Sequence, residues 1–402
     1  MNPIRIVIYE IVDGIKQSKW LPLITAYAVL SAIIGPGLHY QLIHIPIFAI
    51  GLALSIRGGI KPEKAALLLL LYLPLNLLVN HPDAVFHAWK RLALFSIVFI
   101  FASPLLTGQH ICLFRKKTVL GILFICTILG VGSFICYFLG INYMHNQWDG
   151  SVIEDYKNTS GKFGGLLIQS ISLGMICGLG ILYSLYRSFS REKKGKKWYY
   201  LFIVILALTI LLSASRSALL STIVGVLVML YLSNKKKGRF VKVLLGVLLI
   251  GILTYPLWAN FTKGIESKKE INTELGSFGS RTEKWTARVT EFSSHPLFGI
   301  GFASVDKRLD VVGVNGVVEP GSSWLCLLSM TGIIGFILFI IILIKPLQFL
   351  RSNPTPYNVL LLGLLAFICI HMLFEGYIFA GGSSLCFIAW LIIGCCNDAR
   401  YA

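Results

Sequence analysis

The sequence predicts an all-α polytopic membrane protein with about twelve transmembrane helices. Hydrophobic residues make up 56% of the 402 residues, and charged residues make up only 13%. A soluble domain carries roughly twice that share of charge. The apolar residues are also grouped into blocks that approach the length of about 20 residues that a helix needs to cross a bilayer. Lipid must therefore surround much of the chain, and we expect residues 1–402 to form a single integral membrane domain.

The apolar blocks predict the spans, and no cleavable signal peptide is expected before them. The first 19 residues mix charges with short apolar runs, and no small-residue cleavage site follows the first block. Proline and glycine inside several blocks are tolerated, because neighbouring helices satisfy the freed backbone groups. The predicted spans are 20–38, 40–56, 65–80, 92–107, 118–140, 163–186, 198–214, 217–233, 241–260, 322–344, 356–378 and 382–396.

The charges between the spans predict the orientation. Cytoplasmic loops of membrane proteins are rich in Lys and Arg. With the N-terminus inside, alternate segments place the whole formal net charge of +18 on the cytoplasmic side, and the outer segments are neutral in sum. The densest basic runs, 187–197 and 235–242, are interpreted as topology signals beside anionic membrane lipid, and not as nucleic-acid sites. Both termini are therefore predicted to be cytoplasmic.

The longest connection, residues 261–321 between the ninth and tenth predicted spans, is expected to form a partly helical subdomain on the outer face. Adjacent membrane helices need far shorter connections. Ser280 and Glu283 match a capping box, in which each side chain bonds a backbone N–H at the start of a helix. The sequence His295-Pro296 would end this helix at about Ser294.

Basic residues gather on one side of this predicted helix. Arg281, Lys284 and Arg288 follow at spacings of three and four and so share a face. Trp285, Val289 and Phe292 form a second, apolar face, on which the helix could lie over the membrane surface. Arg281 also lies in the first turn, where unpaired backbone N–H groups attract anions. The basic face is therefore either an anion site or an ordinary solvated surface.

Arg216 lies between two apolar blocks, at the outer ends of the predicted spans 198–214 and 217–233. An arginine near membrane depth is costly and needs a partner or an aqueous cavity. It either extends to the lipid headgroups or binds a phosphate-bearing ligand, because guanidinium donates two parallel hydrogen bonds to phosphate oxygens. Lys90 and Arg91 are interpreted as interfacial anchors that could add to the same site.

Three residues near the outer ends of spans are candidates for acid–base chemistry. Glu319 precedes a Pro-Gly turn, where its carboxylate could accept a proton from a hydroxyl as a general base. His371 and Glu375 are four residues apart and face the same way, and burial would shift their titration towards neutral pH. Glu319 is the first choice, and the other two are the second. Each also has a structural explanation, as a turn residue or as an interhelical hydrogen bond.

The sequence contains no motif for a nucleotide or a metal. It has no Walker motif, no GxGxxG, no HExxH and no DxD for a metal-bound nucleotide sugar. The nine cysteines lack the spacing of metal ligands, and no disulfide framework is expected. We therefore expect neither a metal nor another cofactor, and any group that is transferred must arrive already activated.

The order and spacing of four elements resemble the family of O-antigen ligases and polymerases. The elements are Ser-Ala-Ser-Arg-Ser-Ala-Leu-Leu (213–220), Gly-Ser-Arg-Thr-Glu-Lys-Trp (279–285), His-Pro-Leu-Phe-Gly-Ile-Gly-Phe (295–302), and Ser-Trp-Leu with Met-Thr-Gly-Ile-Ile-Gly (323–325 and 330–335). The resemblance covers about residues 200–345. Family arginines that are thought to hold a diphosphate correspond to Arg216 and Arg281 here.

The resemblance implies a membrane glycosyltransferase that works at the periplasmic face of a bacterial inner membrane, without nucleotide or metal. The donor would be a glycan linked to undecaprenyl diphosphate. The acceptor would be another lipid-linked glycan in a polymerase, lipid A-core in a ligase, or a protein hydroxyl in an oligosaccharyltransferase. Arg216 and Arg281, helped by Lys284 or Arg288, would neutralise the diphosphate leaving group.

One departure from the family pattern bears on the acceptor. Ligases usually carry a His-Asn or similar pair before the Ser-Trp-Leu element, and Gly321 and Ser322 stand there in this chain. His295 belongs to the separate His-Pro element and does not replace the missing base. A polymerase therefore becomes more attractive than a ligase. The alternative class is a secondary transporter or lipid-linked glycan flippase, which would show related halves and binding groups near the membrane midplane.

Overall fold

The computed structural model describes residues 21–35, 61–144, 163–189, 196–233, 262, 280–309 and 318–401. These segments are helical apart from turns, an isolated bridge between Ile34 and Leu167, and one short antiparallel pairing of β1 (Lys61–Pro62) with β2 (Leu106–Thr107). Among the described residues, 7 helices are long and apolar enough to cross a membrane. The all-α membrane class predicted from composition is confirmed.

Each predicted span inside the described segments corresponds to a helix, whereas the predicted spans 40–56 and 241–260 lie outside them. Of the predicted outer loop, 262, 280–309 and 318–321 are described, and they include one helix, α13. The helices are α2 (Leu21–Ser31), α4 (Lys64–Asn80), η1 (Ala84–Phe86), α5 (Ala88–Ala102), α6 (Gln109–Leu139), α7 (Ser170–Ser188), α8 (Lys196–Ser213), α9 (Arg216–Ser233), α13 (Ser280–Ser294), α14 (Ser323–Ser352), α15 (Pro356–Phe374) and α16 (Ser384–Asp398).

Some helices differ in extent from the predicted spans. Helix α6 begins at Gln109, well before the predicted start at 118, and α14 continues to Ser352, beyond the predicted end at 344. The predicted spans stop where charged residues appear, but a helix continues through charged residues when they have partners. Helix α5 ends at Ala102, before the predicted end at 107, because residues 106–107 pair with β1.

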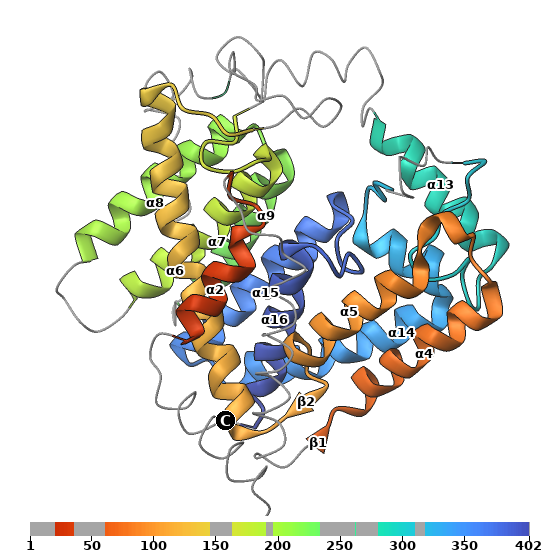
Figure 1. The fold of residues 1–402 in the computed structure, drawn as a ribbon. Helices are drawn as coiled ribbons and strands as arrows, with labels where there is room; N and C mark the ends of the chain where they lie inside the picture. Colours follow the sequence, from red (N-terminus) through yellow and green to blue (C-terminus); the bar gives the residue numbers. More distant parts are fainter. Residues whose placement is uncertain are drawn as a thin grey trace, which may run out of the picture.

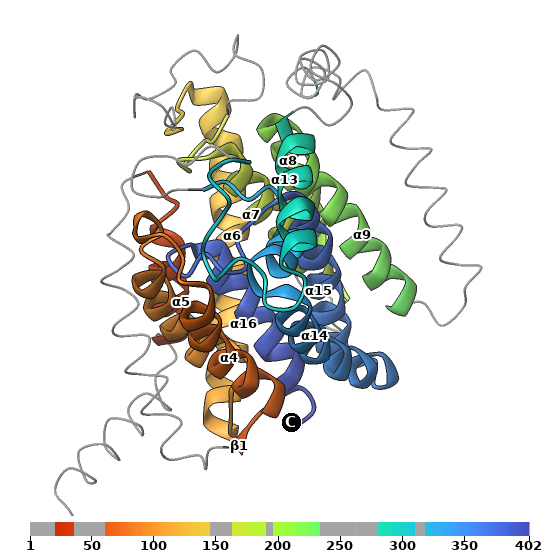
Figure 2. The ribbon, with the colours of Figure 1, turned by 90° about the vertical axis from the view of Figure 1, so that its right-hand side faces the viewer.

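Helices α15 and α16 lie at the centre of the bundle (Figure 1). Helices α2, α6, α7 and α8 form one side, and α4, α5 and α14 form the other. Helix α15 packs extensively on α9, and α13 packs on α14 at the end of the bundle where α15 finishes (Figures 1 and 2). We call this end the Glu375 end, and the end where α16 finishes the Asp398 end.

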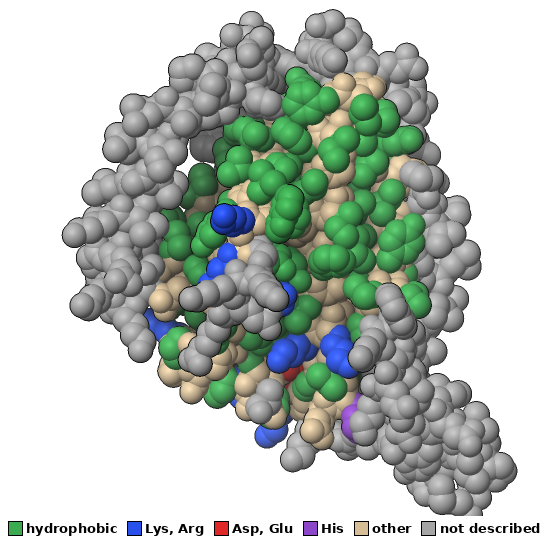
Figure 3. Space-filling model, turned by 90° about the vertical axis from the view of Figure 1, so that its left-hand side faces the viewer, with side chains coloured by type: hydrophobic (Ala, Val, Ile, Leu, Met, Phe, Trp, Pro, Cys, Tyr) green, Lys and Arg blue, Asp and Glu red, His purple; other side chains and the backbone are tan. Residues whose placement is uncertain are grey.

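The outer surface of the bundle is suited to lipid. Large hydrophobic side chains such as Leu75, Phe138 and Trp198 remain more than half exposed on α4, α6 and α8. Figure 3 shows hydrophobic side chains over most of one face, with Lys and Arg gathered mainly towards the Asp398 end. A bilayer removes the cost of exposing such a surface, and the basic groups meet the headgroups.

Helix α14 is interrupted at Gly332, where another segment crosses it. The backbone of Gly332 is in the left-handed region, with φ 62°. Residues 296–301, from the His-Pro-Leu-Phe-Gly-Ile-Gly-Phe element, supply the missing hydrogen bonds: Ile300 N donates to Ser329 O at 2.8 Å, and Ile333 N donates to Pro296 O at 2.9 Å. A Cβ added at Gly332 would lie 2.2 Å from Leu297 O, so only glycine permits this crossing.

Asn76 of α4 holds the other side of the crossing segment. Its Nδ2 donates to Phe298 O at 2.5 Å, and its Oδ1 accepts from Phe302 N at 2.7 Å. The side chain is fully buried, and both of its polar atoms are used. Because the segment follows α13 directly, the clamp fixes the end of α13 against α4 and α14. The third family-like element is thus a structural connection in this chain.

Candidate active site

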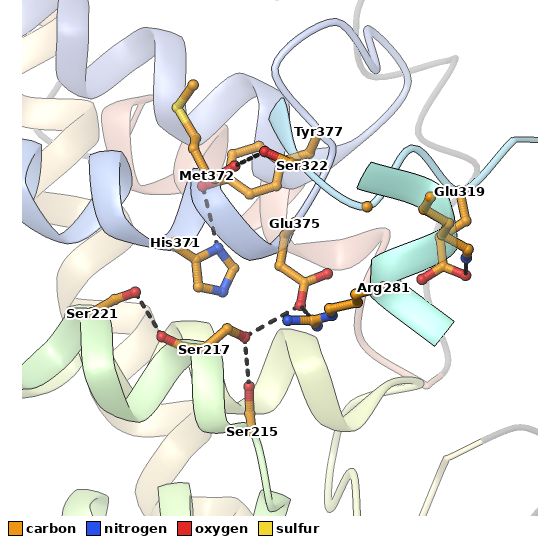
Figure 4. A network of polar contacts seen from close by, with 12 residues as sticks. Ser215, Ser217, Ser221, Arg281, Glu319, Ser322, His371, Met372, Glu375 and Tyr377 are labelled. Carbon is orange, nitrogen blue, oxygen red and sulfur yellow. Dashed lines mark hydrogen bonds and ion pairs between the residues drawn. The ribbon is translucent and has the colours of Figure 1, made fainter. Parts of the chain in front are cut away.

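Helices α9, α13 and α15 converge on one carboxylate at the Glu375 end (Figure 4). The Oε1 atom of Glu375, the first residue after α15, accepts hydrogen bonds from Arg281 Nη2 at 2.7 Å and from Ser217 Oγ at 3.2 Å. Arg281 belongs to α13 and Ser217 to the first turn of α9. Glu375 therefore joins the sequence element that contains Arg216 and Ser217 to the element that contains Arg281. From the sequence, Arg216, Arg281 and Glu375 were separate candidates.

The backbone of Glu375 is fixed by the start of α14. Glu375 N donates to His371 O at 3.1 Å, and Glu375 O accepts from Ser323 N at 3.0 Å and from Ser323 Oγ at 2.6 Å. The Ser323 hydroxyl also accepts from Tyr377 N at 2.9 Å. Ser322 caps α14 and donates to Met372 O at 3.2 Å. Ser323 of the Ser-Trp-Leu element and Ser322 directly before it thus hold the turn that presents Glu375.

Arg216 stands at the first position of α9, beside Ser217. It is exposed, and among the described residues it makes no hydrogen bond or ion pair with a side chain. The turn before it is tight, because Ala214 adopts φ 48° and Ser215 N donates to Ser213 Oγ at 3.4 Å. The unpaired N–H groups of a helix start carry partial positive charge. Arg216 and this helix start therefore place positive charge at the end of α9 that also carries Ser217.

Helix α13 supplies Arg281 and Lys284 from its first two turns. The Arg281 side chain is 33% exposed, and its guanidinium lies 5.7 Å from the Phe374 ring centroid. Lys284 pairs with Glu319. Trp285 Nε1 donates to Gly321 O at 3.2 Å, and its ring packs on Phe374. These contacts turn Trp285 to α14 and α15 and not to the membrane, whereas Val289 of the same predicted apolar face is 50% exposed.

Arg288 shares the predicted basic face with Arg281, but the structure does not bring it to Glu375. Its side chain is fully buried, and Nη2 lies 2.9 Å from Glu291 Oε1. The same Glu291 oxygen accepts from Asp306 N at 2.7 Å. The second half of α13 is covered by the segment after it, so this pair ties the helix to residues 304–306 and faces away from the open part of the site.

The first-choice base, Glu319, is a residue of the rim. Its side chain is 75% exposed and pairs with Lys284. The next residue, Pro320, lies against Gly376, where an added Cβ would come within 2.6 Å of the proline ring. Glu319 is therefore close to the turn that carries Glu375, but it remains in contact with solvent.

Glu375 is in a different environment. Its side chain is only 13% exposed. Burial raises the pKa of the Glu375 carboxyl above its ordinary value of 4.5, and the charge of Arg281 and the hydrogen bond from Ser217 offset this effect only in part. A buried carboxylate of raised pKa is a stronger base than one in water.

His371 lies one helical turn before Glu375 and is fully buried. Its Nδ1 is 3.2 Å from the Tyr377 hydroxyl, and its ring stacks on Phe367 with centroids 5.6 Å apart. Nε2 has no hydrogen-bond partner among the described residues. In Figure 4 the imidazole lies between Tyr377 and Ser217, and no bond joins it to Glu375. The side chains of the predicted His371–Glu375 pair are therefore not hydrogen-bonded to each other.

A cavity of about 380 Å³ opens on the other side of the Glu375 turn. Its lining includes Arg91 of α5, Pro320, Gly376 and Ser383. Arg91, expected from sequence to be an interfacial anchor, thus faces a cavity beside the site. Within the described segments, no group of three or more His, Cys, Asp or Glu side chains is arranged to hold a metal ion.

A family model described as O-Antigen ligase matches residues 201–340. The predicted resemblance to the O-antigen ligase family is confirmed. The match includes α8, α9, α13 and the first half of α14, and so contains Arg216, Arg281 and Glu319. No curated protein matches the chain. The family implies a membrane glycosyltransferase of the ligase or polymerase type.

The O-antigen ligase match ends before His371 and Glu375, which α15 carries into the site from outside the matched region. Sequence reasoning missed the roles of Ser217 and Ser323, both inside the matched elements. The signal for Ser217 was present, because it follows the candidate Arg216 directly. No signal in the sequence connected Ser323 to residues 375–378, since that contact joins segments about fifty residues apart.

Proposed function

We propose that the chain transfers a glycan from an undecaprenyl diphosphate carrier to an acceptor hydroxyl at the periplasmic face of the inner membrane. The observation that carries this proposal is the shared Glu375 oxygen, bonded by Arg281 and by Ser217, the residue that follows Arg216. One arginine pairs with the carboxylate, and a second directly precedes the serine that also bonds it. That combination supplies both requirements of the reaction, a binding site for a polyanion and a base.

Arg281 and Arg216 hold the donor diphosphate in this proposal. Both are accessible, at the starts of α13 and α9, and the N-terminus of α9 adds the partial charge of its backbone N–H groups. The negative charge on the leaving diphosphate grows as the glycosidic bond breaks. Fixed cations at that point stabilise the transition state more than the ground state. Lys284 lies one turn after Arg281 and contributes less, because Glu319 already neutralises it.

Glu375 is the preferred base, ahead of Glu319. The acceptor hydroxyl gives its proton to the Glu375 carboxylate as its oxygen forms a bond to the anomeric carbon. The bond from that carbon to the diphosphate oxygen breaks, and its electron pair leaves with the diphosphate. Attack opposite the leaving group inverts the anomeric centre. Glu319 is exposed and paired with Lys284, whereas Glu375 is buried and more basic.

A polymerase fits the site better than a ligase. Gly321 and Ser322 stand where ligases usually carry a base, and both have structural roles here. Gly321 has φ 77° and accepts a hydrogen bond from Trp285, while Ser322 caps α14. The acceptor of our proposal is therefore a hydroxyl of a second lipid-linked glycan, with lipid A-core and protein hydroxyls as alternatives.

The experiment is gene deletion in the host, with complementation by wild type, Arg281→Ala, Arg216→Ala and the control Arg308→Ala. Arg308 lies in the same outer segment, is 88% exposed and pairs only with Asp306 among the described residues, so its loss should leave product unchanged. We expect each of the other two variants to lose at least about a hundredfold in product at normal protein abundance.

The glycan pattern of the deletion strain separates the acceptors. A ladder that collapses to one repeat unit means a polymerase, whereas long lipid-linked chains that accumulate mean a ligase. Near-normal product from Arg281→Ala or Arg216→Ala would remove that residue from the diphosphate site. An unchanged glycan pattern in the deletion strain would contradict the proposed function.

A further inference from the structure

The Arg281–Glu375 ion pair occupies the place where an external anion would bind. Glu375 Oε1 engages a single nitrogen of the guanidinium, and the Arg281 side chain keeps 33% exposure. Guanidinium can donate two parallel hydrogen bonds to a phosphate, and a diphosphate carries more charge than a carboxylate. A diphosphate on Arg281 and the carboxylate of Glu375 therefore compete for the same donor.

We propose that Glu375 is an internal anion that the donor diphosphate displaces from Arg281, and that this release frees the carboxylate to act as the base. This inference rests on the proposed function. It adds an order of events, in which the base becomes available only after the donor has bound. Acceptor activation without a donor is thereby suppressed, because Arg281 neutralises Glu375 in the empty site.

The geometry allows the carboxylate to move while the chain stays in place. The backbone of Glu375 is held on both sides, by His371 O at its N–H and by Ser323 at its carbonyl. Among the described residues, its side chain is attached to the rest of the site only by the bonds to Arg281 and Ser217. Rotation of the side chain is therefore enough to break the ion pair, and Ser217 can keep its bond to the carboxylate.

Other charged groups near Glu375 do not replace Arg281. Lys284 is paired with Glu319 at the rim, and Arg288 is buried against Glu291. Arg216 has its guanidinium exposed and no ion pair with a described residue. It can meet the diphosphate without a competing carboxylate. The two arginines therefore differ in our inference: Arg281 exchanges one anion for another, and Arg216 only gains one.

The test is the affinity of the protein in lipid nanodiscs for farnesyl diphosphate, with farnesol as the control for binding through the tail. We expect Glu375→Gln to bind about fivefold more tightly than wild type, because the competing anion is gone. Arg281→Ala should bind at least about tenfold more weakly. In the Arg281→Ala background, Glu375→Gln should change the affinity by less than twofold, since the two anions no longer share a donor.

The matched control is Glu283→Gln, which removes an exposed carboxylate two residues from Arg281 that has no ion pair with a described residue, and should change affinity by less than twofold. An equal gain from Glu283→Gln, or the same gain from Glu375→Gln without Arg281, would show a general charge effect and overturn the inference. Unchanged or weaker binding by Glu375→Gln would overturn it too, while the proposed function stands. If wild type binds farnesyl diphosphate no better than farnesol, the proposed function itself fails.

A second measurement uses the wild-type protein, so it does not depend on whether a variant folds. A carboxyl-directed carbodiimide should modify Glu375 about threefold faster when farnesyl diphosphate is present, because release from Arg281 exposes the carboxylate. Mass spectrometry of the peptide that contains Glu375 gives the rate, with Glu319 as the internal reference. A slower or unchanged rate at Glu375 would contradict displacement.

Discussion

An arginine–carboxylate pair joins distant helices at each end of the bundle, and the two pairs differ in how completely the arginine is bonded. At the Asp398 end, Arg115 of α6 is 0% exposed and bonds both oxygens of Asp398, at 2.8 and 2.6 Å. Its remaining N–H groups donate to the carbonyls of Phe101, Ser103 and Leu106. At the Glu375 end, Arg281 makes one bond to one oxygen and stays partly exposed.

The difference separates a structural arginine from a functional one. Guanidinium has five N–H donors, and Arg115 uses all of them within the fold. It therefore has nothing left to offer a ligand. Arg281 keeps donors and surface available, next to an exposed Arg216. Residue type and partner are alike in the two pairs, so we predict from bonding saturation that the Glu375 end, and not the Asp398 end, binds an anion.

The largest expected effect on folding is at the Asp398 end. Arg115→Ala leaves Asp398 buried without its charge partner, and breaking such a pair costs about 3–5 kcal/mol. We expect little folded protein in the membrane, measured as the monodisperse fraction in detergent. Arg281→Ala should keep near wild-type abundance, because Arg281 makes a single bond to Glu375 and the carboxylate keeps its hydrogen bond from Ser217.

The double variant Arg115→Met/Asp398→Leu tests the reason for that effect. Removing both charges also removes the unpaired buried carboxylate, so much of the folded protein should return. Equal loss in the single and double variants would mean that the hydrogen bonds to the three carbonyls matter more than the charge pair. Equal abundance losses for Arg115→Ala and Arg281→Ala would contradict the comparison itself.

A smaller effect is expected at the crossing that holds α13, and hence Arg281, in place. Gly332→Ala would put a Cβ 2.2 Å from Leu297 O in a left-handed conformation, and we expect a loss of about 2–4 kcal/mol. The control is Gly140→Ala, which is also left-handed, with φ 75°, but has nothing within 4 Å of the added Cβ. It should cost about 1 kcal/mol. Thermal unfolding in detergent measures both variants, and equal melting temperatures would mean that the crossing is not tightly packed.

The sequence predicted the helices well and the contacts between them poorly. The capping box and His295-Pro296 predicted the bounds of α13 within a residue, because these signals act over one helical turn. The break in α14 was not predictable, since residues 323–352 form a long, strongly apolar helix with no local sign of an interruption. Gly332 leaves the helical conformation only because a segment that lies about thirty residues earlier supplies the backbone hydrogen bonds.

The candidate site shows the same limit. Arg216 and Glu375 were identified from their position near the ends of predicted spans, and Arg281 from the first turn of the predicted loop helix. The fold brings these helices together. Arg288 shares a helix face with Arg281, yet its side chain is buried. The segment after α13 packs on this part of the helix and leaves the Arg281 side chain partly exposed. Helical spacing predicts which residues share a face. It does not predict which other segment covers that face. That cover decides whether an arginine is available to a ligand or is bonded to other residues of the protein.

The smallest expected effect on stability is that of a second ion pair at the Asp398 end, in which the cation is partly exposed and makes a single bond to the carboxylate. Lys345 Nζ donates to Glu63 Oε1 at 2.9 Å, and Glu63 also caps α4 by accepting from Ala65 N and Ala66 N. The Lys345 side chain is 44% exposed. Such a pair contributes less than about 1 kcal/mol, so Lys345→Met should barely change the melting temperature at neutral pH. A small change in melting temperature would show that Arg115 stabilises the fold because all of its donors are bonded, and not because it lies at the Asp398 end.

The pH dependence of the same variant sharpens the test. Burial raises the pKa of Glu63, but the hydrogen bonds from Lys345, Ala65 and Ala66 outweigh it and lower the pKa below its ordinary value of 4.5. A carboxyl with a lowered pKa in the folded state stabilises the protein above pH 4.5, and this contribution is lost as the pH falls further. Lys345→Met should therefore lower the melting temperature slightly near neutral pH and by less in acid. A loss as large as that of Arg115→Ala would mean that exposure does not weaken the pair, and the distinction between the two ends would then need another cause.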